Sequence, residues 1–174
     1  MRIERLTRKD VGKIEEIDRS EIVRRGYKYE GGKLKSMSVH WDAPGWSPEH
    51  FKKVMDKTAF EVDRGGVFLG ALDGDRLAGF AVLGHKFRGD NLDMLQLVYL
   101  HVSRAYRKQG IATRLMAEAE QLAKKRGARY LYVSSVPSES AVGFYLHEGC
   151  RLAEKVDPEL YALEPEDIHL IKER

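Results

Sequence analysis

The stretch that decides the fold is VSRAYRKQGIAT, which runs from Val102 to Thr113. The apolar run before it, MLQLVYLHV (Met94 to Val102), is typical of a strand. From Gly110 to about Arg126 the apolar residues recur at helical spacing, and Gly127 ends the pattern. The stretch therefore joins a predicted strand to a predicted long helix through a short basic loop.

The predicted start of this helix has the features of an anion site. Backbone N–H groups in a first helical turn have no partner within the helix and together carry a partial positive charge. Gly110 lets a ligand approach the backbone closely, and the small Ala112 keeps that approach open. The segment adds the charges of Arg104, Arg107 and Lys108 and the hydroxyl of Thr113. Taken alone, it is also compatible with an ordinary helix that follows a basic loop.

The rest of the chain predicts a mixed α/β domain over residues 1–174. Thr7 and Asp10 predict a capped helix after a first strand, and Ser47-Pro48-Glu49 predicts the start of a second helix. The other predicted elements are strands at Arg2–Leu6, Gly66–Leu72, Arg76–Gly84, Arg129–Val136, Arg151–Lys155 and Ile168–Lys172, and a helix at Ser138–Glu148. Residues Ser20 to Trp46 show no clear period. This order predicts one mixed sheet with helices on both faces.

Composition excludes several classes of protein. The chain has 174 residues, of which 43% are hydrophobic and 33% charged, and a formal net charge of +3, as in a soluble globular protein with no dominant basic face. No apolar run reaches the length needed to cross a membrane, and the first residues do not resemble a secretory signal, so we expect a cytoplasmic location. A single cysteine, Cys150, excludes an internal disulfide, and no metal site is expected.

Two segments resemble signatures of the GNAT superfamily of N-acetyltransferases. Arg107-x-x-Gly110-x-Ala112, between a strand and a long helix, resembles the acetyl-CoA signature of that family. Further along, SESAVGFYLHEGC resembles its second signature, with Ser138, Ala141, Phe144, Tyr145, Gly149 and Cys150 at the matching places. Two separate motifs in the right order are much harder to obtain by chance than either alone.

The resemblance implies a mostly antiparallel central sheet of about six to seven strands, splayed between the fourth and fifth, with acetyl-CoA as co-substrate in the splay. The implied contacts are to the pantetheine from Leu100, His101 and Val102, and to the pyrophosphate from Arg107, Lys108, Gln109, Gly110, Ile111, Ala112 and Thr113, with Ser138 and Tyr145 nearby. The tyrosine at the place of Tyr145 protonates the departing CoA thiolate in this family. A backbone N–H of the splayed strand is also suited to stabilise the oxyanion of the reaction.

The resemblance does not identify the group that accepts the proton of the attacking amine. Members that acetylate protein lysines carry a glutamate where this chain has Gln96, and an amide cannot take a proton. His101, an acid near the end of the first helix (Glu16, Asp18 or Glu21), or ordered water are the alternatives. Two further departures are Ser138, in place of the usual asparagine, and Cys150, which we interpret as a packing residue.

We therefore predict acetyl transfer to a primary amine of a small molecule or peptide, by direct attack in a ternary complex. The side chains predicted to wall the acceptor site are Tyr27, Tyr29, Trp41, Trp46 and Gln96. A CoA-binding sensor without turnover is one alternative. An RNA- or ribosome-associated acetyltransferase that uses the basic, aromatic stretch Arg24 to Trp46 is another, although the small net charge disfavours nucleic acid. No membrane partner is expected, and a homodimer is left open.

Overall fold

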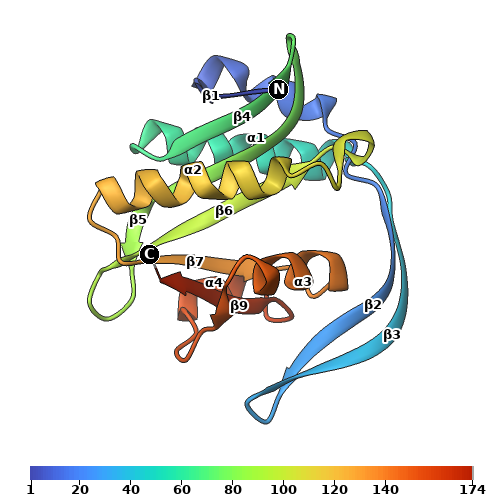
Figure 1. Cartoon of the computed structure of the whole chain (residues 1–174), viewed down its shortest axis with the longest axis vertical. Helices are drawn as coiled ribbons and strands as arrows, with labels where there is room; N and C mark the ends of the chain where they lie inside the picture. The colour runs from blue at the N-terminus through green and yellow to red at the C-terminus, as the bar shows by residue number, and fades with distance from the viewer. Residues whose placement is uncertain (174) are drawn as a thin grey trace.

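The computed structural model describes residues 1–173; the predicted domain ends at Arg174, which lies outside the described residues. Figure 1 shows the arrangement of the elements along the chain. Their order is β1 (Arg2–Leu6), η1 (Arg8–Glu16), β2 (Glu21–Glu30), β3 (Lys33–Ala43), α1 (Pro48–Asp63), β4 (Val67–Asp73), β5 (Arg76–Arg88), β6 (Met94–Val102), η2 (Arg104–Tyr106), α2 (Ile111–Lys125), β7 (Tyr130–Ser135), α3 (Glu139–His147), β8 (Arg151–Leu152), α4 (Pro158–Leu163) and β9 (Ile168–Glu173).

The centre of the molecule is a seven-stranded sheet in the order β1-β4-β5-β6-β7-β9-β8. Neighbouring strands in this sheet are antiparallel except β6 and β7, which are parallel and joined through α2. The predicted mixed, mostly antiparallel sheet is therefore confirmed. The Asp73-Gly74-Asp75 turn joins β4 to β5 as expected, with φ of 61° at Gly74.

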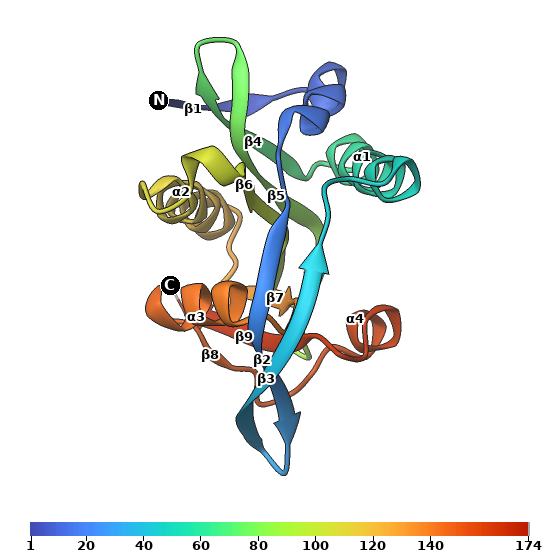
Figure 2. The same ribbon diagram turned by 90° about the vertical axis from the view of Figure 1, so that its right-hand side faces the viewer.

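Helices cover both faces of the sheet. Figure 2 shows α2 and α3 on one side and α1 and α4 on the other. Leu115, Met116 and Ala119 of α2 are fully buried on the first face, where they pack with β4, β5 and β6. On the second face Val54 of α1 and Ile14 of η1 are buried against the same three strands. The apolar stripe read from the sequence therefore buries the expected side of α2.

Strands β6 and β7 pair over only part of their length. The parallel register joins Met94 to Gln96 with Tyr130 to Tyr132, and residues 97–102 have no partner in β7. The other edge of β7 pairs with β9 along the whole length of β7. The predicted splay between these two strands is thus confirmed.

A bulge in β6 decides which side chains face each side at the splay. Val82 of β5 pairs with Tyr99 and Leu83 pairs with Leu97, so Val98 is an extra residue in β6. As a result Leu97 and Leu100 both pack on the α2 side, while Val98 and Tyr99 pack on the α1 side. His101 follows on the α1 side because the alternation of a strand resumes after the bulge.

The stretch from Ser20 to Trp46, predicted to lack regular structure, contains the long hairpin β2–β3. Most of its side chains are exposed, so the alternation that identifies a half-buried strand is missing. The turn Gly31-Gly32, with φ of 61° and 77°, is the sequence signal that could have revealed it. Figure 2 shows the hairpin passing along the molecule from η1 towards α3. Its contact with the body includes the N–H of Tyr27, which donates to the carbonyl of Pro137 at 2.8 Å.

Smaller differences concern the C-terminal third. The strand predicted at residues 151–155 is limited to Arg151–Leu152, because the chain then turns away to form α4. Helix α4 begins at an Asp157 N-cap, whose carboxylate accepts from the N–H of Leu160 at 3.0 Å. Its apolar side chain Leu160 packs on Tyr132 of β7 and thereby covers the sheet next to the splay.

Candidate acetyl-transfer site

Helix α2 begins with backbone donors that the chain leaves free. Its N-cap, Gly110, has φ of 80° and supplies no side chain, so the first-turn N–H groups of residues 111–113 have no cap. A methyl group added at Gly110 would meet nothing within 4 Å, which leaves open space over these donors. This start of α2 therefore fits an anionic group, as the predicted pyrophosphate site requires.

Arg107 supports this loop through three backbone carbonyls. Its Nε donates to Val102 at 3.1 Å, its Nη1 to Ser20 at 3.0 Å and its Nη2 to Asp18 at 3.3 Å. The side chain thus ties the end of β6 to the segment that enters β2. Its charge has no acidic partner among the described residues, so it adds positive potential beside the start of α2. Direct contact of Arg107 with a phosphate stays a prediction.

Other side chains of the loop are engaged within the chain. Thr113 donates its hydroxyl to Glu148 at 2.7 Å, and the amide of Gln109 donates to the carbonyl of Ala105 at 3.3 Å. Lys108 has φ of 61°, which gives the loop its turn before Gly110. The backbone of this loop and the exposed side chain of Lys108 therefore remain available to a ligand.

The end of β6 offers a second set of backbone groups. Leu100 and Val102 pack with the core under α2, while their strand has no β7 partner on the open side. Every second N–H and C=O of an unpaired strand faces outward and can pair with an extended amide ligand. The splay therefore fits a pantetheine arm laid along residues 100–102.

Tyr145 of α3 is buried on the α2 side of the sheet, with its ring against Phe144 at a centroid distance of 5.3 Å. Burial raises the pKa of Tyr145 above its ordinary value, so the hydroxyl stays protonated at neutral pH. Ser138 caps the same helix: its Oγ accepts from the N–H of Ala141 at 3.3 Å beneath β2. The hydroxyl of Ser138 thus acts as a helix cap, one of the roles expected for it.

His101 lies among aromatic rings on the α1 side of the splay. Its ring centroid is 5.3 Å from Phe80 and 5.5 Å from Trp46. Burial, with smaller contributions from nearby positive groups, lowers the pKa of His101 to about 3. The imidazole is therefore neutral at pH 7 and accepts protons poorly, which weakens its case as the general base.

The predicted acceptor residues divide into two groups. Gln96 is buried on β6 and Trp46 lies beside His101, so both are near the splay. Tyr27 is partly buried against the core, whereas Tyr29 and Trp41 are 51% and 42% exposed on the hairpin. The structure thus places Trp46 at the end of β6 and Gln96 at the last paired position before the splay, and leaves Tyr29 and Trp41 facing solvent.

Asp167 is a carboxylate beside the splayed part of β7 that the sequence did not reveal. It precedes β9 and accepts a hydrogen bond from Ser134 Oγ at 2.8 Å, on the part of β7 that β6 no longer pairs with. Burial raises the pKa of the Asp167 carboxyl, an effect that the Ser134 hydrogen bond opposes. No motif marks this residue; only the pairing of β7 with β9 brings it to the splay.

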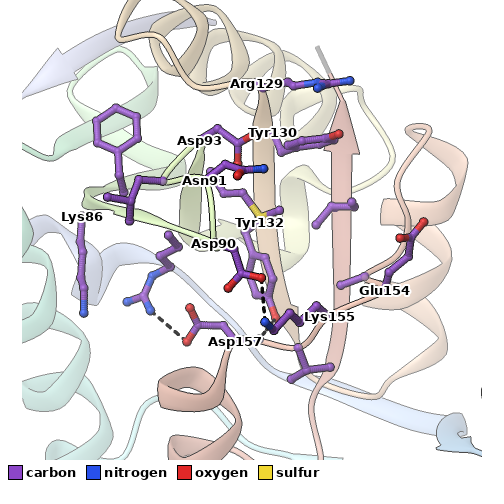
Figure 3. Close-up of a pocket in the computed structure, with 18 of the residues that line it drawn as sticks. Lys86, Asp90, Asn91, Asp93, Arg129, Tyr130, Tyr132, Glu154, Lys155 and Asp157 are labelled. Atoms are coloured by element: carbon purple, nitrogen blue, oxygen red, sulfur yellow. Dashed lines mark hydrogen bonds and ion pairs between the residues drawn. The ribbon is translucent and has the colours of Figure 1, made fainter.

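A cavity among the described residues lies elsewhere. It has a volume of about 440 Å³ and is situated where β6 and β7 begin, at their hydrogen-bonded end (Figure 3). The cations along its wall are paired within the chain, as in Lys155 with Asp90 at 2.7 Å and Arg88 with Asp157 at 3.2 Å. Carboxylates of the chain therefore already neutralise these cations, and the features that fit acetyl-CoA lie at the splayed end instead.

Known proteins resemble this chain in both sequence and fold. The model of the Acetyltransferase (GNAT) family matches residues 35–149. The chain belongs to this family. It is accordingly an N-acetyltransferase, and acetyl-CoA is its acyl donor. No curated protein sequence matches the chain.

Solved structures share the fold of this acetyltransferase over nearly its whole length. Nourseothricin acetyltransferase is 22% identical with a TM-score of 0.73, over 99% of this chain and 97% of that one. PaiA N-acetyltransferase from Thermoplasma acidophilum, solved with coenzyme A, is 20% identical with a TM-score of 0.63, over 100% of both chains. Aminoglycoside 6'-acetyltransferase type Ii is 18% identical with a TM-score of 0.66, over 99% of this chain and 97% of that one.

Two further observations bear on what the enzyme binds. Within residues 1–173 no three His, Cys, Asp or Glu side chains gather as a metal ion would require. The helices of the same residues are too short or too polar to cross a bilayer.

Proposed function

We propose that this enzyme transfers the acetyl group of acetyl-CoA to a primary amine of a small molecule or peptide, by direct attack in a ternary complex. The observation that carries the proposal is the pairing gap between β6 and β7 next to the uncapped start of α2. The first feature suits the amide-bearing pantetheine arm of acetyl-CoA, and the second suits its diphosphate. An acetyl-CoA bound to both would have its thioester at the splay. The solved acetyltransferases named for antibiotics support an amine as the acceptor class.

The chemistry follows from this placement. The amine nitrogen attacks the thioester carbonyl and forms the new C–N bond, and the C–S bond then breaks. A free N–H of residues 97–102 of β6 is suited to stabilise the oxyanion in between. The thiolate takes a proton from the Tyr145 hydroxyl, which burial keeps protonated. The products are the N-acetylated amine and CoA.

The proton lost by the ammonium needs an acceptor, for which we propose Asp167. Its carboxyl has a raised pKa and accepts from Ser134, on the part of β7 that β6 does not pair with. A carboxylate with a raised pKa is a better base than an ordinary one. His101, with a pKa of about 3, and Gln96, an amide, are both poorer candidates.

The test is thiol release from acetyl-CoA with a panel of primary amines: amino acids, short peptides, polyamines and aminoglycosides. We expect amine-dependent release of CoA and a stoichiometric N-acetyl product, seen by mass spectrometry. Sequential rather than ping-pong kinetics would support direct attack. Release at the background rate with every amine, despite tight acetyl-CoA binding, would overturn the proposal.

A further inference from the structure

Arg19, in the segment between η1 and β2, lies at the acceptor side of the splay. Its guanidinium carbon is 4.9 Å from the centre of the Trp46 ring, and Trp46 in turn contacts His101 of β6. The backbone on either side of Arg19 is fixed to the loop before α2, since the carbonyls of Asp18 and Ser20 accept from Arg107. Arg19 is therefore held in place beside the end of β6.

The two edges of the Arg19 guanidinium differ in their hydrogen bonding. Nη1 donates to His50 Nδ1 at 2.5 Å, while within residues 1–173 the buried Nε has no hydrogen-bond partner. Nε and Nη2 form the edge with which arginine binds a carboxylate through two parallel hydrogen bonds. Arg129 of the same chain directs this edge at Glu173, where Nε and Nη2 both donate to Oε1, at 2.9 Å and 2.8 Å.

The surroundings of Arg19 lack the negative charge that this edge would bind. Burial lowers the pKa of the Arg19 guanidinium, and no carboxylate among the described residues offsets that effect. The indole N–H of Trp46, which stacks on Arg19, is likewise buried without a partner. Glu164 is the acidic group nearest to His50 on this side, and it forms an exposed pair with Lys53 at 3.9 Å.

Unsatisfied buried donors are rare in folded proteins, and a functional role at a binding or catalytic site is one explanation for them. We propose that the acceptor of this enzyme carries a carboxylate as well as its amine, as an amino acid does, and that the Nε–Nη2 edge of Arg19 binds this carboxylate. This inference rests on the proposed function and names the class of its acceptor. A polycationic acceptor is disfavoured because the charges of Arg19 and Arg107 would repel it.

The experiment compares amines that differ only in the carboxylate. Common α-amino acids and their α-amides are assayed pairwise by CoA release, with the wild type, Arg19→Gln and Arg19→Lys. The measured quantity is the ratio of kcat/KM for acid over amide. We expect Arg19→Gln to lower this ratio by about 10- to 100-fold, since a charge-assisted bidentate contact is lost. Arg19→Lys should lie between, because it keeps the charge without the fork.

An amino acid and its amide differ in the basicity of the amine, but this difference is the same for every enzyme variant. It therefore cancels when the acid-to-amide ratio of kcat/KM is compared between variants. Arg24→Gln is the matched control, because Arg24 is an exposed arginine of β2, and it should leave the ratio unchanged. Acetyl-CoA affinity and melting temperature should be equal in all variants. A fall in acetyl-CoA affinity in Arg19→Gln would assign Arg19 to the donor instead.

The outcomes separate the two proposals. If amides or polyamines are acetylated as well as the acids, and Arg19→Gln changes neither, this inference is wrong while the proposed function stands. A preference for acids that survives Arg19→Gln overturns the role of Arg19. If no amine of either kind is acetylated, the proposed function itself fails.

Discussion

Tyr145 and Asp167 lie on opposite sides of the sheet at the splay, and burial raises the pKa of each. For a tyrosine this favours the protonated hydroxyl, which can donate. For an aspartate it makes the carboxylate a stronger base than an exposed one. The two residues are thus suited to the two ends of acetyl transfer, the departing thiolate and the attacking amine.

Replacing Tyr145 by phenylalanine tests the first of these roles. We expect kcat to fall by about tenfold or more, because the thiolate would leave without a positioned proton donor. The affinity for acetyl-CoA, measured by calorimetry, should change little. Tyr161→Phe, at an exposed position of α4, is the control. Wild-type turnover in Tyr145→Phe would remove Tyr145 from the mechanism.

Asp167→Asn tests the second role. We expect kcat/KM to fall by about 100-fold, the usual contribution of a general base. Wild-type kcat/KM should rise with pH as the Asp167 carboxyl loses its proton. Ser134→Ala removes a hydrogen bond that stabilises the carboxylate, so its pKa should rise and the acidic limb of the profile should move to higher pH. If the acidic limb of the kcat/KM profile lies at the same pH in Ser134→Ala as in the wild type, that limb belongs to a group other than Asp167.

At the scale of elements, the hairpin β2–β3 is placed by its contact with the start of α3. Gly26 forms a bridge with Ser138, and a methyl group added at Gly26 would lie 3.0 Å from the carbonyl oxygen of Pro137. Arg25 also pairs with Glu139 at 3.3 Å. The hairpin thus approaches α3 closely because residue 26 has no side chain.

Gly26→Val should therefore push β2 away from α3. We expect a loss of about 1–3 kcal/mol of folding free energy from overpacking, measured by urea unfolding, and a higher KM for the acceptor. The acetyl-CoA affinity should stay close to that of the wild type, since the start of α2 is not touched. Gly45→Ala is the control, because an added methyl group there meets nothing within 4 Å. An unchanged KM for the acceptor in Gly26→Val would mean that the hairpin takes no part in acceptor binding.

At the scale of the whole molecule, partly or fully buried histidines couple folding to pH. Burial lowers the pKa of His50 and His169, and that of His101 to about 3. An unfolded histidine takes up a proton near pH 6.5, so between about pH 6.5 and 3 the unfolded chain binds more protons than the folded one. Stability should therefore fall as the pH falls through this window.

His101→Gln should make this acid dependence shallower. One buried histidine contributes up to about 1.4 kcal/mol of unfolding free energy per pH unit, which is the slope that the variant should lose. The measurement is urea unfolding from pH 4.5 to 7. His40→Gln, at an exposed position of β3, should keep the wild-type slope. Equal slopes in all proteins would contradict burial of an uncharged His101.

The sequence predicted those parts of the enzyme that depend on local pattern. The alternation of β4 and β5, the apolar stripe of α2, the Asp-Gly turn and the glycine before α2 each act within a few residues. The two signatures predicted the family and the splay. The hairpin escaped prediction because both its faces are largely exposed, and α4 because it is a short element.

By itself, then, the sequence determined the element order, the reaction class and the backbone expected to hold acetyl-CoA, since these follow from local periodicity and contiguous motifs. Only the tertiary structure decided which side chains meet across the splay. Asp167 reaches it through the pairing of β7 with β9, and Arg19 lies beside His101 through Trp46. Such contacts join residues far apart in the chain, and their effects on charge arise from burial, which only the folded molecule creates.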